Sequence, residues 1–278
     1  MYQNVIFDLY GTLADIRTNE DSPYLWRKMS DIYSALGALY SARELKLEYK
    51  RLVAVAVEQA AEKLSQGNTW KRMYGDGTSR VAKNQAEPDI TEVFAQLFRQ
   101  KGISCDRTQA RFIAITFRVL SRMRLELYDG VIELLEQLRK DGKGVYLLSN
   151  AQSDFTRPEL DKLGLIPYFD GILISSEEGV KKPSPLFFHR LLDRYHLDAS
   201  ECIMIGNDEY SDIAGAKAVG MDCLYIHTDI SPAPIRYCHP SSPTVPMPVI
   251  HWPTWWRRCP RPSLAAPWRS NITVSSPS

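Results

Sequence analysis

The sequence predicts an α/β protein: a doubly wound parallel sheet, interrupted by an inserted all-helical unit and followed by an irregular, proline-rich tail. Three observations predict it. From Tyr128 onward, short apolar runs alternate with helical stretches, which favours a parallel sheet with helices on both faces. Residues 15–127 show helical periodicity without a strand pattern, and residues 229–278 show no regular period.

The expected core consists of residues 1–14 and 128–228. An apolar run over residues 3–9 predicts its first strand. Similar runs predict further strands at 143–149, 171–175, 202–206 and 222–227, with helices expected at 129–140, 154–163, 184–195 and 211–219. Because active sites in such sheets lie at the carboxyl ends of the strands, we expect the chemistry there.

The inserted unit is expected over residues 15–127. A helix is predicted at 24–36, and Ser41 with Glu44 forms a capping-box pattern that opens a second helix running to about Leu64. Two more helices are expected at 90–101 and 107–126. The stretch 68–88, rich in Gly, Asn and Lys, is expected to be a loop.

Composition excludes several classes of protein. The 278-residue chain has 34 Lys and Arg against 33 Asp and Glu, a net charge of +1, so no global attraction to nucleic acid or to an anionic membrane is expected. Five cysteines without a CxxC pair do not indicate a disulfide scaffold or structural zinc. No apolar run approaches the ~20 residues of a membrane span, and the first residues lack a signal-peptide pattern. A cytoplasmic protein is therefore expected.

The tail differs sharply from the rest of the chain. Residues 230–278 hold 11 of the 17 prolines and 4 of the 6 tryptophans, and proline every few residues blocks both helix and strand. Three interpretations remain open: a disordered appendage, a basic interaction segment in polyproline II conformation, and the product of a shifted reading frame.

Polar side chains follow the predicted strands. In chain order they are Asp8 and Thr12, Ser149 and Asn150, Lys182, and the cluster Asn207, Asp208, Glu209 and Asp212. Each of them alone also fits an ordinary turn, helix cap or surface position. Together, at one edge of one sheet, they supply a nucleophilic carboxylate, a hydroxyl, a cation and carboxylates suited to a hard divalent ion.

Four segments carry a resemblance to a known family. DLYGTL at 8–13, LLSN at 147–150, KKP at 181–183 and GNDEYSDIAGAKAVGM at 206–221 resemble the four ordered motifs of the haloacid dehalogenase-like (HAD) hydrolase superfamily. The resemblance covers about residues 3–228. It implies a Rossmann-like core, and the helical insert resembles the superfamily's C1-type helical cap.

The resemblance also implies roles for individual residues. Asp8 would be the nucleophile, forming a covalent aspartyl intermediate that water hydrolyses. Ser149 would bind an oxygen of the transferring group, Lys182 would offset negative charge, and Thr12 and Asn150 would contact the substrate. The implied cofactor is Mg²⁺, with candidate ligands Asp8, the backbone carbonyl of Tyr10, Asn207, Asp208 and Asp212.

Two positions depart from the family pattern. Phosphatases of the superfamily usually have an Asp acid/base two residues after the nucleophile, where this chain has Tyr10. A phenol with a reference pKa of ~10 is a poor base near neutrality, so aryl or acyl phosphates, whose leaving groups are acidic, should be the better substrates. The usual Asp of the fourth motif is replaced by Asn207, which offers a metal only a neutral oxygen.

The first hypothesis is therefore a Mg²⁺-dependent phosphatase that acts on a small phosphorylated metabolite. A 2-haloacid dehalogenase is the alternative, because a halide leaves without a proton and such enzymes also have Tyr at this position; Arg27 is the candidate cationic clamp in the cap. A third possibility is a catalytically weak binding protein of the same fold. The expected partner is a small-molecule substrate, with neither nucleic acid nor membrane.

Overall fold

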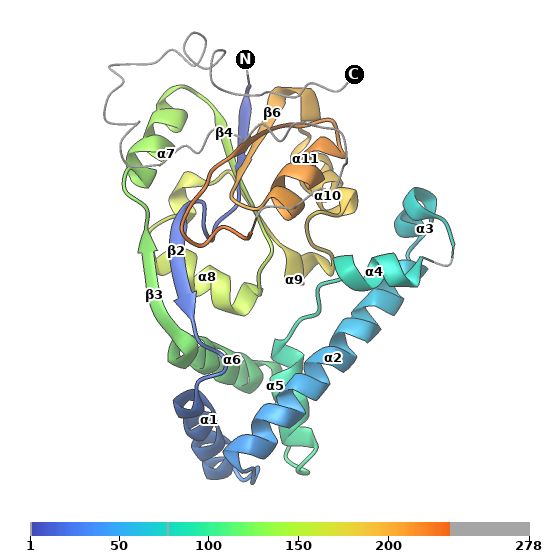
Figure 1. The fold of residues 1–278 in the computed structure, drawn as a ribbon, viewed down its shortest axis with the longest axis vertical. Coiled ribbons are helices and arrows are strands. Elements are labelled where there is room, and N and C mark those ends of the chain that lie inside the picture. Colours follow the sequence, from blue (N-terminus) through green and yellow to red (C-terminus); the bar gives the residue numbers. More distant parts are fainter. Residues whose placement is uncertain (1, 77, 234–278) are drawn as a thin grey trace.

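A five-stranded parallel sheet forms the centre of the protein, whose computed structural model describes residues 2–76 and 78–233 (Figure 1). Its strands are β1 (Asn4–Phe7), β4 (Gly144–Ser149), β5 (Gly171–Ile174), β6 (Cys202–Gly206) and β7 (Asp222–Tyr225). The order β5-β4-β1-β6-β7 puts β1 in the middle, with β4 and β6 on either side. The predicted fold class is confirmed, and the chain order reverses beside β1, where ligands bind in such sheets.

Helices cover both faces of the sheet, as the apolar strands require. They are α7 (Val131–Lys140), α8 (Ser153–Lys162), α9 (Ser175–Glu178), α10 (Pro185–Tyr195) and α11 (Ala214–Lys217), with a π-helical turn at Glu209–Ile213 and 3₁₀ turns at Ile166–Tyr168 and Ala199–Glu201. Ile6 belongs to one buried cluster with α10 and α11, whereas Val5 and Phe7 belong to another with α7 and α8. This alternation follows from the two-residue period of a strand.

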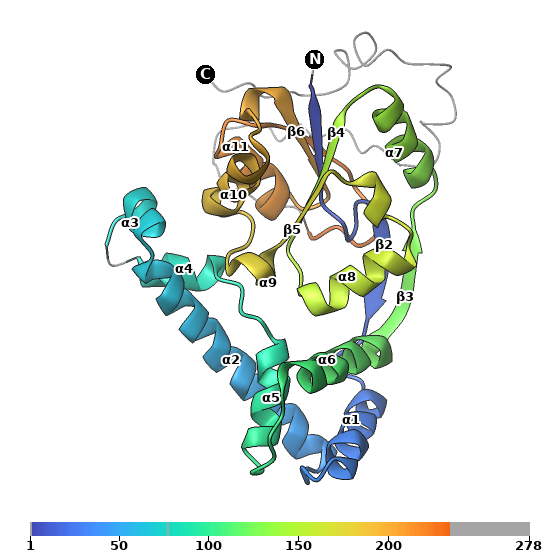
Figure 2. The same ribbon diagram turned by 180° about the vertical axis from the view of Figure 1, so that it is seen from behind.

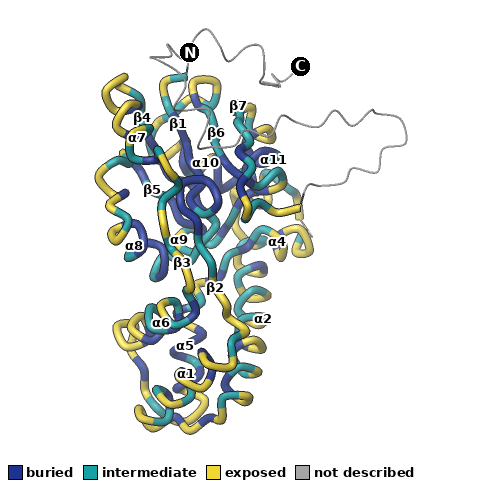
Figure 3. Tube along the Cα trace, turned by 60° about the vertical axis from the view of Figure 1, so that its left-hand side comes forward, coloured by how far each residue is buried: buried dark blue, intermediate teal, exposed yellow. Residues whose placement is uncertain are grey.

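The inserted unit contains six helices: α1 (Pro23–Ala35), α2 (Ala42–Gln66), α3 (Asn68–Tyr74), α4 (Ser79–Gln85), α5 (Thr91–Arg99) and α6 (Arg107–Ser121). It has an aromatic cluster in which Trp26, Tyr49 and Phe117 are in mutual contact, and this cluster extends to Phe155 on α8. The predicted capping box of α2 forms, since the Ser41 side chain accepts from Glu44 N at 3.2 Å. Figures 2 and 3 show this unit at one end of the sheet, and Figure 3 marks its buried residues in dark blue.

The loop expected over residues 68–88 is wrong. This stretch forms the short helices α3 and α4. Trp70 and Ala82, which lie on these helices, are buried in the same cluster as residues of the sheet. The Gly and Asn residues mark only the ends of the helices, because burial of an aromatic side chain outweighs weak local helix propensity.

Two strands that we did not predict connect the sheet to the inserted helices. β2 (Ala14–Thr18) pairs in antiparallel fashion with β3 (Arg122–Leu127), and Ala14 lies opposite Leu127. The helix expected over 107–126 therefore ends at Ser121, and the unit is helical only between these strands. Arg, Met, Leu and Glu favour helices locally, but pairing across more than 100 residues of sequence decides this segment.

No helix among the described residues is both long and apolar enough to cross a bilayer. The cytoplasmic location stays a prediction. The expectations about the tail concern mainly residues 234–278, which lie outside the described residues.

The central sheet should dominate stability. Leu147 on β4 is fully buried, whereas Leu47 on α2 is 58% exposed. Because a large-to-small change in a core leaves a cavity, Leu147→Ala should lower the free energy of unfolding by about 2–5 kcal/mol. The same change at Leu47 should lie within about 0.5 kcal/mol of the wild type. Urea denaturation measures both, and equal losses would contradict the assignment of the core.

Candidate active site

Asp8, the first residue of the predicted site, lies where the carboxyl ends of three neighbouring strands meet. Phe7, the last residue of β1, is in register with Leu147 of β4 on one side and with Ile205 of β6 on the other. Asp8 therefore lies beside the end of β4 and the end of β6, and its backbone N–H donates to Ile205 O at 2.9 Å. Parallel pairing alone explains this convergence.

Lys182 holds the centre of the site. Its Nζ lies 2.7 Å from Asp8 Oδ1 and 2.7 Å from Asp212 Oδ1, and it donates to Leu148 O at 2.6 Å. The residue is only 2% exposed. Burial lowers the pKa of Lys182, but the charges of Asp212 and Asp8 outweigh this effect and hold its pKa above the ordinary value. The ammonium thus stays charged, as a buried ion pair requires.

Asn150 holds the backbone of Lys182 in place. The Asn150 side chain accepts from Lys182 N at 2.8 Å and donates to Lys182 O at 3.0 Å. We expected Asn150 to contact substrate, but in this structure both ends of its amide bind the protein. Its position after β4 explains how a lysine on a distant loop reaches Asp8.

Asp8 is a carboxylate with one side engaged. Burial raises the pKa of Asp8 to about 6; Lys182 lowers it and the negative charge of Asp212 raises it. Oδ1 faces Lys182, and Oδ2 has a long contact of 3.4 Å from the Thr12 hydroxyl; a backbone hydrogen bond from Leu9 also stabilises the carboxylate. The second oxygen is therefore weakly held and able to act as a nucleophile or a metal ligand.

Ser149 contributes a hydroxyl without a partner. The residue is 1% exposed, and its Oγ has no hydrogen-bond partner among the described residues. An unsatisfied buried hydroxyl costs about 1–3 kcal/mol, and such groups in native proteins call for an explanation. A ligand oxygen at this strand end would satisfy it.

The loop after β1 passes very close to the end of β6. Gly11 has φ +87°, and a Cβ on it would lie 2.0 Å from Asn207 Nδ2. Glycine is thus required here both by the left-handed backbone and by the contact. Thr12, which is fully buried, lies 3.4 Å from Asp8 Oδ2 and 3.4 Å from Asn207 Oδ1. These two oxygens consequently face the same hydroxyl.

The two aspartates of the fourth motif have different environments. Asp208 accepts from Tyr210 N at 2.9 Å and from the Ser211 hydroxyl at 2.7 Å, so both of its oxygens cap the turn that follows. Asp212 is 1% exposed and reaches Lys182, while its other oxygen accepts from Asp208 N at 3.0 Å. Asp212 thus shares the Lys182 ammonium with Asp8, whereas Asp208 caps the turn.

Tyr10 does not join this group through its side chain. Its hydroxyl donates to Glu159 and lies 3.1 Å from the Thr156 hydroxyl, both on α8. Burial, with a further contribution from the charge of Glu159, raises the pKa of Tyr10. No sequence pattern points to Glu159, because an acidic residue on an amphipathic helix is normally exposed; here it is 1% exposed.

A model of the haloacid dehalogenase-like hydrolases matches residues 2–220. This chain belongs to that family. Its relatives include a ribulose-1,5-bisphosphate 5-phosphatase from Halopiger xanaduensis, 39% identical over 36% of this chain and 42% of its own length. A phosphoserine phosphatase from Thermus thermophilus is 29% identical over 59% of this chain and 64% of its own length. The chain therefore spans less than two thirds of these relatives.

The fold of this HAD hydrolase is also similar to a solved structure. The 2-haloacid dehalogenase from Pseudomonas syringae pv. Tomato DC3000 superposes with a TM-score of 0.50 at 23% identity, over 82% of this chain and 86% of that one. Similarity at this level concerns the fold alone. The site chemistry must be argued from the residues of this chain.

The available oxygens suit magnesium better than a softer metal. No group of three or more His, Cys, Asp or Glu residues that could hold a metal occurs in 2–76 or 78–233. Asp8 Oδ2 and Asn207 Oδ1, which share the Thr12 hydroxyl, provide one carboxylate and one neutral oxygen. Mg²⁺ accepts such a set, since it commonly uses one or two carboxylates and completes its shell with water and substrate phosphate.

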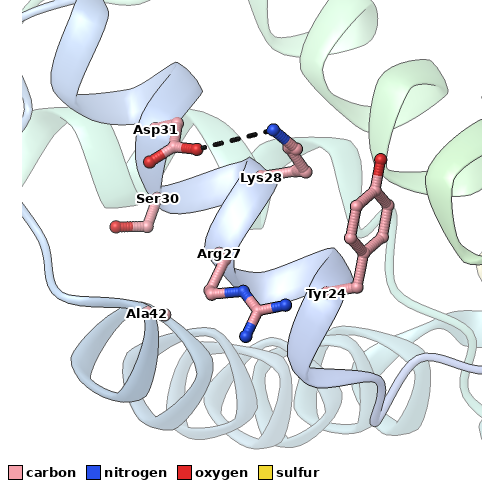
Figure 4. A pocket seen from close by; sticks show the side chains of 6 residues that line it. All are labelled: Tyr24, Arg27, Lys28, Ser30, Asp31 and Ala42. Atoms are coloured by element: carbon pink, nitrogen blue, oxygen red, sulfur yellow. Dashed lines mark ion pairs between the residues drawn. The ribbon is translucent and has the colours of Figure 1, made fainter.

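A hollow of about 440 Å³ lies elsewhere, on the cap. It is lined by Tyr24, Arg27, Lys28, Ser30, Asp31 and Ala42 (Figure 4). None of the strand-end residues lines it, and α1 lies at the end of the cap far from the sheet (Figures 1 and 2). Arg27, our candidate clamp for a dehalogenase substrate, is exposed in this hollow. The polar residues at the strand ends are the groups suited to catalysis, and none of them lines this hollow, so we do not place the reaction site there.

Removing the buried ammonium should be costly. Lys182→Met leaves Asp8 and Asp212 without their counter-charge, so the free energy of unfolding should fall by about 3–5 kcal/mol. Lys181→Met is the matched control, because the Lys181 side chain is 33% exposed and lies 3.6 Å from Glu87; it should lose less than about 1 kcal/mol. Chemical denaturation of both variants compares them, and similar losses would refute the role of Lys182.

A nucleophilic role for Asp8 predicts that activity declines in acid, because a carboxyl group must be ionised to attack. With its pKa raised to about 6, the ionised fraction falls as the pH drops through 6. Below that value, kcat/KM should decrease about tenfold per pH unit; cation binding at Oδ2 would move this limb to lower pH, never higher. A pH profile between 4 and 9 measures it. Activity that increases from pH 7 to pH 5 would contradict an ionised nucleophile.

Proposed function

We propose that this HAD hydrolase is a Mg²⁺-dependent phosphatase of small phosphorylated metabolites, acting through a covalent intermediate on Asp8. One observation carries the proposal. The partnerless hydroxyl of Ser149 lies at the end of β4, next to the Asp8–Lys182 ion pair. A phosphoryl group bound between them would satisfy the hydroxyl and face both the nucleophile and the ammonium.

The proposed reaction has two displacements at phosphorus. Asp8 Oδ2 attacks phosphorus, the bond from phosphorus to the leaving oxygen breaks, and the leaving group departs with that electron pair. Water then attacks phosphorus of the aspartyl phosphate, and the bond from phosphorus to Asp8 Oδ2 breaks. Its electron pair returns to the carboxylate, and the water oxygen and its protons leave with inorganic phosphate and solvent. Ser149 would donate to a phosphoryl oxygen, and Lys182 would offset the charge that accumulates near Asp8. In phosphoryl transfer, such positioning and charge stabilisation are the protein's main contributions.

Charge supports the requirement for a divalent ion. Asp8 and Asp212 carry two negative charges and Lys182 one positive charge, so a phosphate dianion would approach a site that is already net negative. Asp8, Asn207 and the backbone carbonyl of Tyr10 would hold the ion. When bound, Mg²⁺ supplies the missing positive charge and binds phosphoryl oxygen.

The leaving group should be acidic. The Tyr10 hydroxyl donates to Glu159, and its pKa lies above the ordinary value, so it is a poor source of a proton for an alkoxide. The leaving groups of aryl and acyl phosphates, an aryloxide and a carboxylate, depart without that proton. We propose in addition that residues 1–14 and 128–228 form the catalytic unit, while the cap at 15–127 selects the substrate, because the strand-end chemistry is generic. The phosphatase names of the two relatives support the reaction class.

A 2-haloacid dehalogenase is the second candidate. Tyr10 favours it, since a halide needs no proton to leave. The two buried carboxylates with one ammonium disfavour it, because a carboxylate substrate would meet net negative charge.

One set of assays separates these functions. The protein should release phosphate from p-nitrophenyl phosphate and acetyl phosphate with Mg²⁺ and lose this activity in EDTA. Asp8→Asn should reduce the rate by at least about 10⁴-fold, whereas Asp161→Asn, the same change at an exposed position of α8, should not. EDTA-resistant phosphate release would contradict the metal, and halide release from 2-chloropropionate alone would favour the dehalogenase. An absence of turnover on a broad panel would indicate a binding protein.

A further inference from the structure

A buried carboxylate outside the strand-end site connects its own helix to three other segments of the chain. Glu159 on α8 is 1% exposed. Its Oε1 accepts from Arg118 Nε at 2.8 Å and from Arg122 Nη1 at 2.9 Å, while Oε2 accepts from Arg118 Nη2 at 3.2 Å and from the Tyr10 hydroxyl. Each oxygen of this carboxylate therefore accepts two hydrogen bonds, which offset the cost of burying its charge.

Glu159 and its three partners come from both the inserted helical unit and the core. Arg118 lies on α6 of the cap and Arg122 begins β3, whereas Glu159 belongs to the core helix α8. Figures 1 and 2 both show α6 lying alongside α8, and the two helices pack together. Tyr10 is the remaining partner, and it lies two residues after the nucleophile.

The network holds its charge. Burial alone would raise the pKa of Glu159, but the hydrogen bonds and charge of Arg118 outweigh it and leave the pKa below the ordinary value. The Arg118 guanidinium also lies 5.7 Å from the centre of the Tyr10 ring and 5.4 Å from that of Phe155. Two aromatic faces and a bidentate carboxylate fix the guanidinium plane, which a lysine could not reproduce.

Tyr10 is tied to the nucleophile loop through its backbone. Residues Leu9 to Ala14 form a tight turn, in which Gly11 N donates to Ala14 O at 2.8 Å and Ala14 N donates to Leu9 O at 2.9 Å. A displacement of the Tyr10 backbone is therefore a displacement of the turn that contains Thr12 and directly follows Asp8.

We propose that Glu159 and Arg118 are positioning residues that couple cap helix α6 to the nucleophile loop, with the Tyr10 side chain as the link and not as a proton donor. Cap placement is thereby transmitted to Asp8 without contact between cap and nucleophile. The kinetic part of this inference rests on the proposed phosphatase function; the structural part does not.

Leaving groups distinguish positioning from proton donation. Tyr10→Phe keeps the ring and removes only the hydroxyl, so the fold should survive. A positioning role predicts that kcat falls by one common factor, about 3- to 30-fold, for p-nitrophenyl, phenyl and alkyl phosphates, with KM little changed. A proton donor predicts a loss that grows to about 10²–10⁴-fold for the alkyl ester and vanishes for p-nitrophenyl phosphate. The second pattern would overturn the inference.

Hydrogen exchange tests the coupling even if no phosphate ester is a substrate. Arg118→Gln leaves Glu159 paired with Arg122 and Tyr10, so an unpaired buried charge is avoided. It should speed amide exchange both in α6 and in the turn of residues 9–14. Arg111→Gln is the control, because Arg111 also joins α6 to α8, through Asp154 at 3.0 Å, but is 51% exposed. It should leave exchange in the turn unchanged.

The outcomes of the exchange experiment are distinct. Faster exchange in the turn for Arg118→Gln alone supports the coupling, whatever the substrate proves to be. Unchanged exchange in the turn for Arg118→Gln, or the same acceleration for both variants, would overturn it. A failure of phosphate release with coupling intact would instead count against the proposed function.

Discussion

The arrangement of the site depends on one ammonium group placed between two buried carboxylates. Lys182 Nζ lies 2.7 Å from oxygens of both Asp8 and Asp212, and none of the three residues could remain charged at this depth alone. Several other features follow from this constraint. The Asn150 amide holds the lysine backbone, the loop after β5 must reach across to β1, and Asp212 turns away from solvent.

The same ion pair occupies only one of the two oxygens of Asp8. One oxygen of Asp8 is neutralised by the lysine, while the other is left with a 3.4 Å contact. Within the part of the chain that the structure describes, the neighbouring Ser149 hydroxyl has no hydrogen-bond partner. A ligand oxygen there would relieve the cost of leaving this buried group unsatisfied. One oxygen of this carboxyl group is paired and the other is weakly held, which is the arrangement that the proposed nucleophile requires.

The inserted helical unit is joined to the core in several ways. Its aromatic cluster includes Phe155 of α8, and the β2–β3 pair and the Glu159 network also connect it to the core. At Tyr10 the chain differs from the pattern that is usual in phosphatases of the superfamily, and the structure shows contacts that this side chain makes. A phenol at this position bonds with a buried glutamate on the core side and stacks near an arginine from the cap side, where a short aspartate could not reach both.

By itself the sequence determined the parallel sheet and the strand ends where polar residues gather, since apolar periodicity and the geometry of parallel strands are local rules. It could not determine the β2–β3 pairing, because those residues favour helix until they meet across the chain. Nor could it choose between Asp208 and Asp212, four residues apart in one turn, or foresee that the Tyr10 hydroxyl bonds with Glu159. These outcomes depend on which partners burial brings together, and only the tertiary structure sets the energy of a buried charge.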